Sequence, residues 1–394
     1  VLRGAGPGAS RVFFTRFTGM TDVHHITFRG AVSRDADVLL ATDGVQRSDT
    51  VHVADASGLA VGDSVSVGWV ITDDFVAEHG MTGTWVTFNG LWKPFFRREI
   101  AAIDTSATPH AVTLDVPLRY AAKVRDFASL RRESGYIHEV GIEDLGLSNA
   151  VVYDDAFASD RAHVVGMLQV ADAWVRNVAS YDSAHGEGSY HLQSGGIIIE
   201  RSKRVTVTDS RMDNAQHRGS GGNGYLVEVT RSSEVLFRDV IATNGRHNFI
   251  QNWDFGNSGC VWLRCTSIGS TAVGILALPA YSEYHHSLAM ANLVDSCVLD
   301  DGWSTVNRGS QSSGAGHSAT EGVFWNTSGS GLIRSMQYGW GYIIGTQGMS
   351  LATSLSDSRA GGTAPEDFVE GSGTGSSLSP SSLYEDQLLR RLQP

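Results

Sequence analysis

Short segments that alternate apolar and polar residues recur along most of the chain. Val205–Thr208 and Val235–Arg238 are two examples, and a period of two is typical of strands rather than helices. From about residue 140 onward, each segment has an apolar residue followed two positions later by Asn, Asp, Ser or Cys. These later positions are Asn177, Asp209, Asp239, Cys265, Ser296 and Asn326. They are separated by 32, 30, 26, 31 and 30 residues, so the sequence contains an internal repeat.

Further strand-like runs lie between the repeat positions. They are Gly196–Glu200, Tyr225–Val229, Phe249–Trp253 and Gly274–Leu278. Two or three short strands per repeat, joined by polar turns, describe one coil of a β-solenoid. Successive coils would stack at about 4.8 Å. The pattern therefore predicts an all-β protein, a right-handed parallel β-helix.

The remaining segments divide the chain into four parts. We predict N-terminal β-helix coils at 1–45, an inserted β-rich subdomain at 46–130, the main β-helix with an active groove at 131–356, and a Gly/Ser-rich linker with a short C-terminal helix at 357–394. The insert is rich in aromatic residues, which either form its core or stack on sugar rings. Trp85, Trp92 and Phe95 are the residues considered for stacking.

Composition excludes several classes of partner. The net charge is −12 and no Lys/Arg-rich run exists, so a nucleic-acid partner is not expected. No apolar run approaches the roughly 18–20 residues of a membrane helix. Cys260, Cys265 and Cys297 are too few for a disulfide framework and are interpreted as buried apolar residues. Val1 stands in a predicted strand, so we interpret it as a processed or trimmed start.

The repeat of Asn177, Asp209, Asp239 and their counterparts resembles the pectin lyase-like superfamily of right-handed β-helices. The resemblance covers roughly 140–350 and the first 45 residues. It implies a secreted or extracellular protein that binds glycans along one face of the helix. That superfamily contains polysaccharide lyases, glycoside hydrolases, epimerases and phage tailspikes, so the resemblance indicates the fold more strongly than the activity.

Histidines recur at one offset in three successive coils. Eight residues after the first three repeat positions stand His185, His217 and His247, with Arg218 and Arg246 beside two of them. If the turns keep register, these histidines stack and line one groove. The alternatives are a purely structural column and, less favoured, a metal site.

Other chemistry-bearing residues lie in the zone between Asp182 and Arg308, with Trp92 in the insert. The expected catalytic residues are His217, His247, Arg246, Asp213 and Asp254. The expected substrate-binding residues are His185, Glu187, Arg218, Asn252, Trp253, Tyr281, Asn307, Arg308 and Trp92. A polar ladder of Asp182, Asn214 and Asn244 is interpreted as structural, and His285-His286 as a surface loop.

Three functions compete for this set of residues. In a β-elimination on a uronate glycan, His217 or His247 is the base, and Arg218, Arg246 or Arg308 binds the carboxylate. In a glycoside hydrolysis, a pair drawn from Asp213, Asp254 and Glu187 acts as acid and as base or nucleophile. The third function is a non-catalytic glycan-binding solenoid. The lyase is favoured, because basic side chains gather in one zone of an acidic protein.

No cofactor or metal ligand is assigned from the sequence. Calcium could assist a lyase through carboxylate oxygens, but no dedicated calcium loop is found. The expected partner is a polysaccharide, and the oligomeric state stays open.

Overall fold

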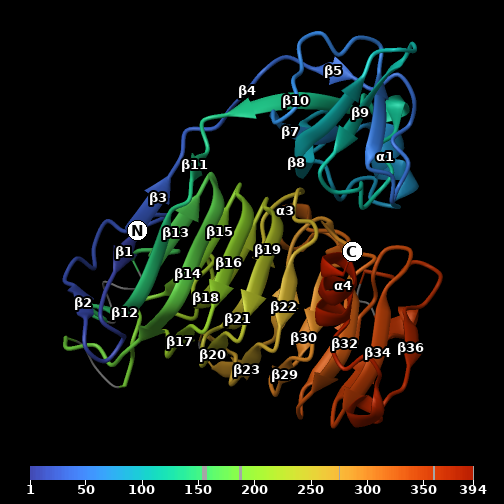
Figure 1. Ribbon diagram of the computed structural model, residues 1–394. Helices are drawn as coiled ribbons and strands as arrows, with labels where there is room; N and C mark the ends of the chain where they lie inside the picture. The colour runs from blue at the N-terminus through green and yellow to red at the C-terminus, as the bar shows by residue number, and fades with distance from the viewer. Residues whose placement is uncertain (153–157, 186–188, 275, 358–359, 394) are drawn as a thin grey trace.

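The computed structural model describes residues 1–152, 158–185, 189–274, 276–357 and 360–393, and it shows a parallel β-helix with an antiparallel subdomain beside it (Figure 1). The predicted fold is therefore confirmed, including the inserted β subdomain and the short C-terminal helix. Two parallel sheets wind along the helix, and we call them sheet 1 and sheet 2.

Sheet 1 consists, in spatial order, of β3 (His24–Arg29), β13 (His163–Leu168), β15 (Gly195–Glu200), β18 (Tyr225–Thr230), β21 (His247–Asn252), β26 (Ser282–Tyr284), β30 (Trp303–Thr305), β33 (Leu332–Ser335) and β35 (Ser350–Ala352). The main row of sheet 2 consists of β1 (Leu2–Arg3), β12 (Gly141–Asn149), β14 (Val170–Ser180), β16 (Lys203–Thr208), β19 (Ser233–Arg238), β22 (Val261–Leu263), β28 (Leu293–Asp295), β32 (Val323–Ser328), β34 (Tyr342–Gln347) and β36 (Phe368–Glu370). A second row contains β17 (Arg211–Asp213), β20 (Ile241–Thr243), β23 (Thr266–Ile268) and β29 (Val298–Leu299), while β2 (Arg11–Phe14) and β11 (Ile137–His138) pair at the N-terminal end. Two small pairs complete the helix: β24 (Thr271–Val273) with β25 (Ala277–Pro279), and β27 (Ala289–Met290) with β31 (Ala319–Thr320).

The repeat position recognised in the sequence is the bend between the two rows of sheet 2. Its residues adopt left-handed backbone with φ between 49° and 56°: Asn177, Asp209, Asp239, Ser296 and Asn326. Asn and Asp tolerate this conformation better than other non-glycine residues, which explains why they recur. In the fourth coil the expected Cys265 is wrong by one residue. Strand register places Arg264 beside Asp239, and Arg264 has the left-handed φ of 51°.

Apolar side chains of both sheets fill the interior of the helix. Trp262 is fully buried there, with ring centroids 5.3 Å from Phe237, 5.7 Å from Tyr284 and 5.3 Å from Trp303. Cys260, Cys265 and Cys297 are buried free thiols, as predicted.

Replacing Trp262 with alanine is expected to lower the free energy of unfolding by about 3–5 kcal/mol, because a large cavity would open in a packed core. Urea denaturation measures the change. Trp262→Phe is the control: it keeps a ring and removes an indole N–H that has no acceptor among the described residues, so its cost should be smaller. An equal decrease in the free energy of unfolding for both variants would contradict this packing.

The subdomain leaves the helix after β3 and returns before β11. Its antiparallel sheet contains β4 (Ser33–Arg34), β5 (Val38–Leu39), β6 (Thr50–Val53), β7 (Ser64–Val70), β8 (Trp92–Asp104), β9 (His110–Leu114) and β10 (Ser129–Ser134), and helix α1 (Asp73–Glu78) packs beside it. The range of 46–130 expected from the sequence lies within this segment.

The aromatic residues of the insert form its core. Trp85 and Phe95 are buried, so the sugar-stacking alternative is wrong for them. Trp92 has Arg131 over its ring at 3.9 Å, and a Cβ on Gly68 would lie 2.4 Å from that ring. Its faces are therefore covered by protein. The same core receives Phe255 of the β-helix, whose ring lies 5.1 Å from that of Trp85, so the subdomain packs directly against the coils.

Helix α4 (Leu383–Leu392) lies against the flank of the helix (Figure 1). The backbone N–H of Tyr384 and the hydroxyl of Ser382 both donate to Asp295, at 2.7 and 2.9 Å. The one-turn helix α3 (Gln311–Gly314) and three short 3₁₀ turns, Val124–Asp126, Leu355–Asp357 and Gly375–Ser377, complete the helical elements of the described chain. None of these helices has the length and apolar character needed to span a bilayer.

Candidate functional site

A cavity of about 480 Å³ lies beside the start of β18 and the end of β21 in sheet 1. Its polar and aromatic lining consists of Arg161, Tyr225, Arg246, Asn252, Trp253, His285 and His286, with Ser312 and Ser313 of α3 at its edge. The strands hold these groups through main-chain pairing: Tyr225 pairs with His247, and Thr230 pairs with Asn252.

Glu283 organises one wall of the cavity. Its carboxylate accepts a short hydrogen bond from His285 Nδ1 and another from Arg308 Nη1 at 3.0 Å. Nδ1 of His285 thereby carries the proton, which leaves Nε2 as the basic nitrogen, 3.4 Å from the Ser312 hydroxyl at the cavity edge. His247 lies behind this pair, with Nε2 3.2 Å from Glu283 Oε1 and Nδ1 donating to the Tyr281 carbonyl at 2.6 Å.

Glu228 lies in the same row of sheet 1 as Glu283, two strands away, and organises a second cluster beside the cavity. Arg161 Nη2 donates to its Oε1 at 2.8 Å and Asn252 Nδ2 at 2.9 Å, while His163 Nε2 lies 3.2 Å from Oε2. Burial alone would raise the pKa of Glu228, but the charge of Arg161 and these contacts lower it to about 2. This carboxylate is therefore ionised at any ordinary pH.

The titratable groups of the cavity have widely separated pKa values. Burial opposes ionisation of Glu283, yet His247, His285 and Arg308 hold its pKa well below 4.5. Burial lowers the pKa of His285 below 6.5, although Glu283 opposes this shift. Burial also raises the pKa of Tyr225 above its ordinary 10.0. At neutral pH the site thus presents a neutral imidazole and a protonated phenol.

Arg246 differs from the other cations at the cavity. Its Nη1 donates to the carbonyl of Gly219, and no carboxylate of the described residues lies within ion-pair distance of its guanidinium. Arg161 and Arg308, in contrast, are both paired with glutamates. Judged by the part of the chain that the structure describes, Arg246 is the cation of this cavity whose charge is available to a ligand.

Among the described residues, one group could converge on a metal ion: His247, Glu283 and His285. Arg308 Nη1 lies 3.0 Å from both Glu283 Oε2 and His285 Nδ1, and this fixed positive charge opposes a second cation there. Two nitrogen donors are also unlike the all-oxygen shell that calcium prefers. The donor set does not fit calcium at this place.

Five of the sequence-predicted residues gather at the cavity. Arg246, Asn252 and Trp253 line it, while His247 and Arg308 contact Glu283 behind the wall. Four of them, from Arg246 to Trp253, lie on or next to strand β21, which keeps them close together at the cavity.

The predicted stack of His185, His217 and His247 does not form. In the structure, Tyr225 rather than His217 is the strand partner of His247. His217 lies in the long turn before β18, with Nε2 3.5 Å from Asp160 Oδ1. His185 is exposed, its ring stacked on Phe17 at 6.4 Å. Unequal turn lengths break the register that the stack requires.

The other predicted residues lie elsewhere, and Glu187 lies outside the described residues. Arg218 lines a shallow hollow beside the turn ladder, where Asn244 donates to Asn214 at 2.7 Å. Tyr281 offers only its carbonyl, to His247. Asn307 donates to the Gly361 carbonyl at 2.9 Å.

The proposed hydrolase pair of Asp213 and Asp254 is not brought together, and the pairs that include Glu187 lie outside the described residues. Asp213 belongs to sheet 2, where it accepts hydrogen bonds from Arg211 and Thr243. Asp254 follows sheet 1 and pairs with Lys93 at 2.7 Å, in a separate crevice that Trp92 also lines.

Sequence reasoning missed Glu228, Glu283, Tyr225 and the pair His285-His286. The surface-loop interpretation of that pair is wrong, because the two residues are 6% and 2% exposed. A signal existed: Glu283 and His285 alternate in a run with Tyr284, which faces the core, so both point to its other face.

No protein-family model matches the sequence, and no curated protein is significantly similar to it. Two solved phage tailspikes share the fold. The gp61 tailspike of Pseudomonas phage phi297 is 12% identical, with a TM-score of 0.52 over 89% of this chain and 53% of that one. The gp54 tailspike of Acinetobacter baumannii bacteriophage AP22, solved in complex with A. baumannii capsular saccharide, is also 12% identical, with a TM-score of 0.50 over 87% and 51%. The chain therefore has the β-helix fold of these tailspikes and spans about half their length.

Proposed function

We propose that this protein cleaves an acidic, uronate-containing polysaccharide by β-elimination at the sheet 1 cavity. The observation that carries the proposal is the presence, in one cavity, of Arg246, which has no carboxylate partner among the described residues, and of a His285 imidazole oriented by Glu283. Such polysaccharides lie outside cells, and we expect the protein to act there. The capsular saccharide bound by the AP22 tailspike agrees with a glycan ligand for this fold.

Arg246 would bind the uronate carboxylate. A guanidinium can donate two parallel hydrogen bonds to a carboxylate, and it stabilises the charge that moves onto that group when the α-proton leaves. Arg161 also lines the cavity, but it is already neutralised by Glu228. The main electrostatic contribution therefore falls to Arg246.

His285 Nε2 would remove the proton α to the carboxylate. The electrons of that C–H bond form the new double bond, and the bond from the β-carbon to the glycosidic oxygen breaks. Tyr225, kept protonated by its raised pKa, would donate its proton to the departing oxygen. His286 is a poorer base, because burial lowers its pKa to about 3 and no carboxylate of the described residues is hydrogen-bonded to its ring.

Hydrolysis is the less favoured chemistry at this cavity. It requires a carboxylic acid that is protonated near neutral pH, which means a raised pKa. Glu228 and Glu283 both have lowered pKa values and are paired with arginines. Neither is suited to donate a proton.

A panel of polymers tests the proposal. Polygalacturonate, alginate and hyaluronan are incubated with the full chain beside neutral dextran, and ultraviolet absorbance of unsaturated products is recorded with new reducing ends. We expect at least one uronate polymer to yield both signals together, and dextran to yield neither. Reducing ends without absorbance, or cleavage of dextran alone, would refute β-elimination.

A further inference from the structure

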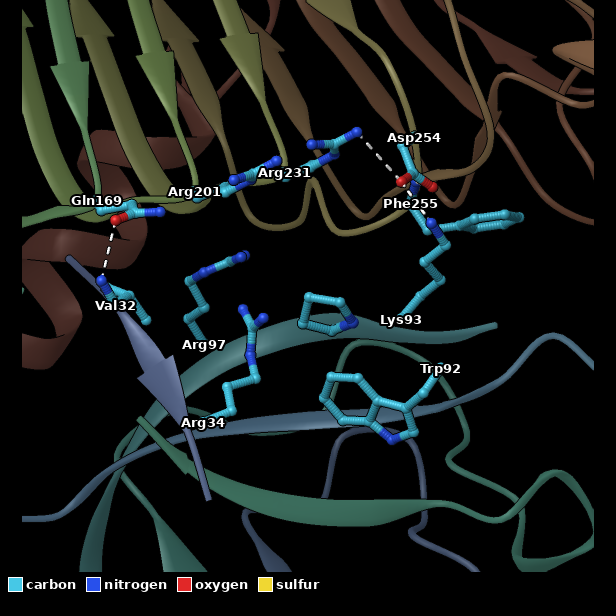
Figure 2. A pocket seen from close by; sticks show the side chains of 11 residues that line it. Val32, Arg34, Trp92, Lys93, Arg97, Gln169, Arg201, Arg231, Asp254 and Phe255 are labelled. Carbon is cyan, nitrogen blue, oxygen red and sulfur yellow. Dashed lines mark hydrogen bonds and ion pairs between the residues drawn. The ribbon is translucent and has the colours of Figure 1, made fainter. Parts of the chain in front are cut away.

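A second, strongly basic crevice lies between the subdomain and the β-helix (Figure 2). Its volume is about 430 Å³. Arg34, Lys93 and Arg97 reach it from the subdomain, and Arg201 and Arg231 reach it from turns of the β-helix. Five cations thus converge in a protein whose net charge is −12.

Arg97 is the unusual member of this group. It lies on β8 and is only 2% exposed, yet Nε, Nη1 and Nη2 donate no hydrogen bond to any part of the chain that the structure describes. A buried charge without partners is costly, because it loses its hydration and gains nothing in return. Figure 2 shows its guanidinium in the space between the two parts of the molecule, near that of Arg34.

The nearby carboxylates are already used by other cations. Glu133 accepts from Arg34 at 2.7 Å, and Asp254 pairs with Lys93 at 2.7 Å and with Arg231 at 3.4 Å. Arg97 lowers the pKa of Glu133 but forms no ion pair with it.

Glu200 is a third acid near the crevice, and it contacts Arg201 at 3.2 Å and Arg231 at 3.7 Å. Three acids therefore face five cations. The surplus of positive charge is centred on Arg97, which has no ion-pair partner among the described residues.

We propose that this crevice is a second subsite for the acidic glycan, in which the carboxylate of a uronic acid unit binds Arg97. The choice of a glycan as the source of the carboxylate rests on the proposed function. The end of β21 connects the two sites: Asn252 and Trp253 line the cavity, and Asp254 lines the crevice. Two Cα steps of about 3.8 Å separate Asn252 from Asp254, so a short oligosaccharide could reach both sites.

The test measures binding of small anions by calorimetry to the full chain carrying Arg246→Ala, which removes the cavity's available cation. The probes are sodium glucuronate, glucose and inorganic sulfate. We expect glucuronate to bind, glucose not to bind, and Arg97→Met to weaken glucuronate about tenfold or more. Equal affinity with and without Arg97 would overturn the proposal. Binding of sulfate without glucuronate would overturn the assignment to a sugar carboxylate.

Thermal unfolding separates binding from a structural role. Replacing an unpaired buried charge by an apolar side chain of similar length is expected to leave the melting temperature of the ligand-free protein unchanged or higher. Glucuronate should then raise the melting temperature of the parent chain and not that of Arg97→Met. A lowered melting temperature of ligand-free Arg97→Met would mark Arg97 as structural and overturn the proposal.

Failure of the two proposals would look different. If no polymer is cleaved but glucuronate still binds in an Arg97-dependent way, the second-subsite proposal is supported and the β-elimination proposal is refuted. If unsaturated products form and Arg97→Met changes neither glucuronate binding nor KM, the second-subsite proposal is refuted and the β-elimination proposal is supported.

Discussion

Replacing His285 with alanine is expected to lower kcat on the cleaved uronate polymer by about 10²–10⁴-fold, the usual contribution of a general base. His285 Nε2 is the basic nitrogen at the cavity edge, because Glu283 accepts the proton of Nδ1. Initial rates of ultraviolet absorbance, at saturating polymer, measure the effect. The matched control is His185→Ala, since His185 is exposed and stacks on Phe17 away from the cavity.

The pH profile supplies the second part of this prediction. The neutral form of His285 is the active one, so kcat/KM should rise with pH through the pKa of His285 and then stay level. Because burial lowers that pKa below 6.5, the rise should be centred at a lower pH than for an exposed imidazole. The raised pKa of Tyr225 should keep the plateau intact to about pH 10.

Glu283→Gln provides the check on that assignment. It removes the negative charge that raises the pKa of His285, so the acid limb should move to lower pH while kcat falls. An unchanged acid limb, or full activity of His285→Ala, would exclude His285 as the base.

Replacing Arg246 with alanine is expected to raise KM for the uronate polymer and to lower kcat/KM about 10- to 100-fold. Charge-assisted hydrogen bonds to a carboxylate contribute about 1.5–3 kcal/mol, and each 1.36 kcal/mol corresponds to a factor of ten. The effect should be large because Arg246 has no carboxylate partner of its own among the described residues. Steady-state kinetics across polymer concentrations measure both constants.

Arg246→Lys and a methyl-esterified polymer are the controls. Lysine keeps the charge but not the paired donors, so it should restore only part of kcat/KM. On the methyl ester, which lacks the carboxylate charge before the proton is removed, the difference between Arg246→Ala and the parent protein should be smaller. Equal kcat/KM for the two proteins on the acidic polymer would contradict the role of Arg246.

The fold could be predicted because one structural requirement recurs in every coil. A bend with positive φ lies within or just after successive strands of the main row of sheet 2, and Asn or Asp satisfies it at Asn177, Asp209 and Asp239. The exception shows the limit of this reasoning. In the fourth coil the residue at the bend is Arg264. Arginine is not a residue type typical of such a bend, so the sequence alignment predicted Cys265 instead.

Apart from Arg308, the predicted residues that gather at the cavity follow a single strand. Arg246, Asn252 and Trp253 are close in the sequence and remain close at the cavity. The histidine column failed because it crosses coils through turns of unequal length. The turn between β17 and β18 spans 214–224, whereas the one between β20 and β21 spans 244–246.

Sheet 1 does contain a column of aligned residues, but it differs from the predicted column of His185, His217 and His247. Strand register aligns one residue on each of five successive strands: His24, His163, Gly195, Tyr225 and His247. Gly195 fits because a Cβ there would lie 2.3 Å from the His163 ring. Only strand pairing, which the spacing of residues does not determine, identifies this column.

The mass of the products tests the central claim most directly. Elimination adds no water, so each cut leaves one fragment that is lighter than its saturated counterpart by one water molecule. Mass spectrometry of a complete digest of the cleaved polymer should show this unsaturated residue at every new non-reducing end, and none in a digest attempted with His285→Ala. Fragments that have all gained water would contradict β-elimination at this cavity.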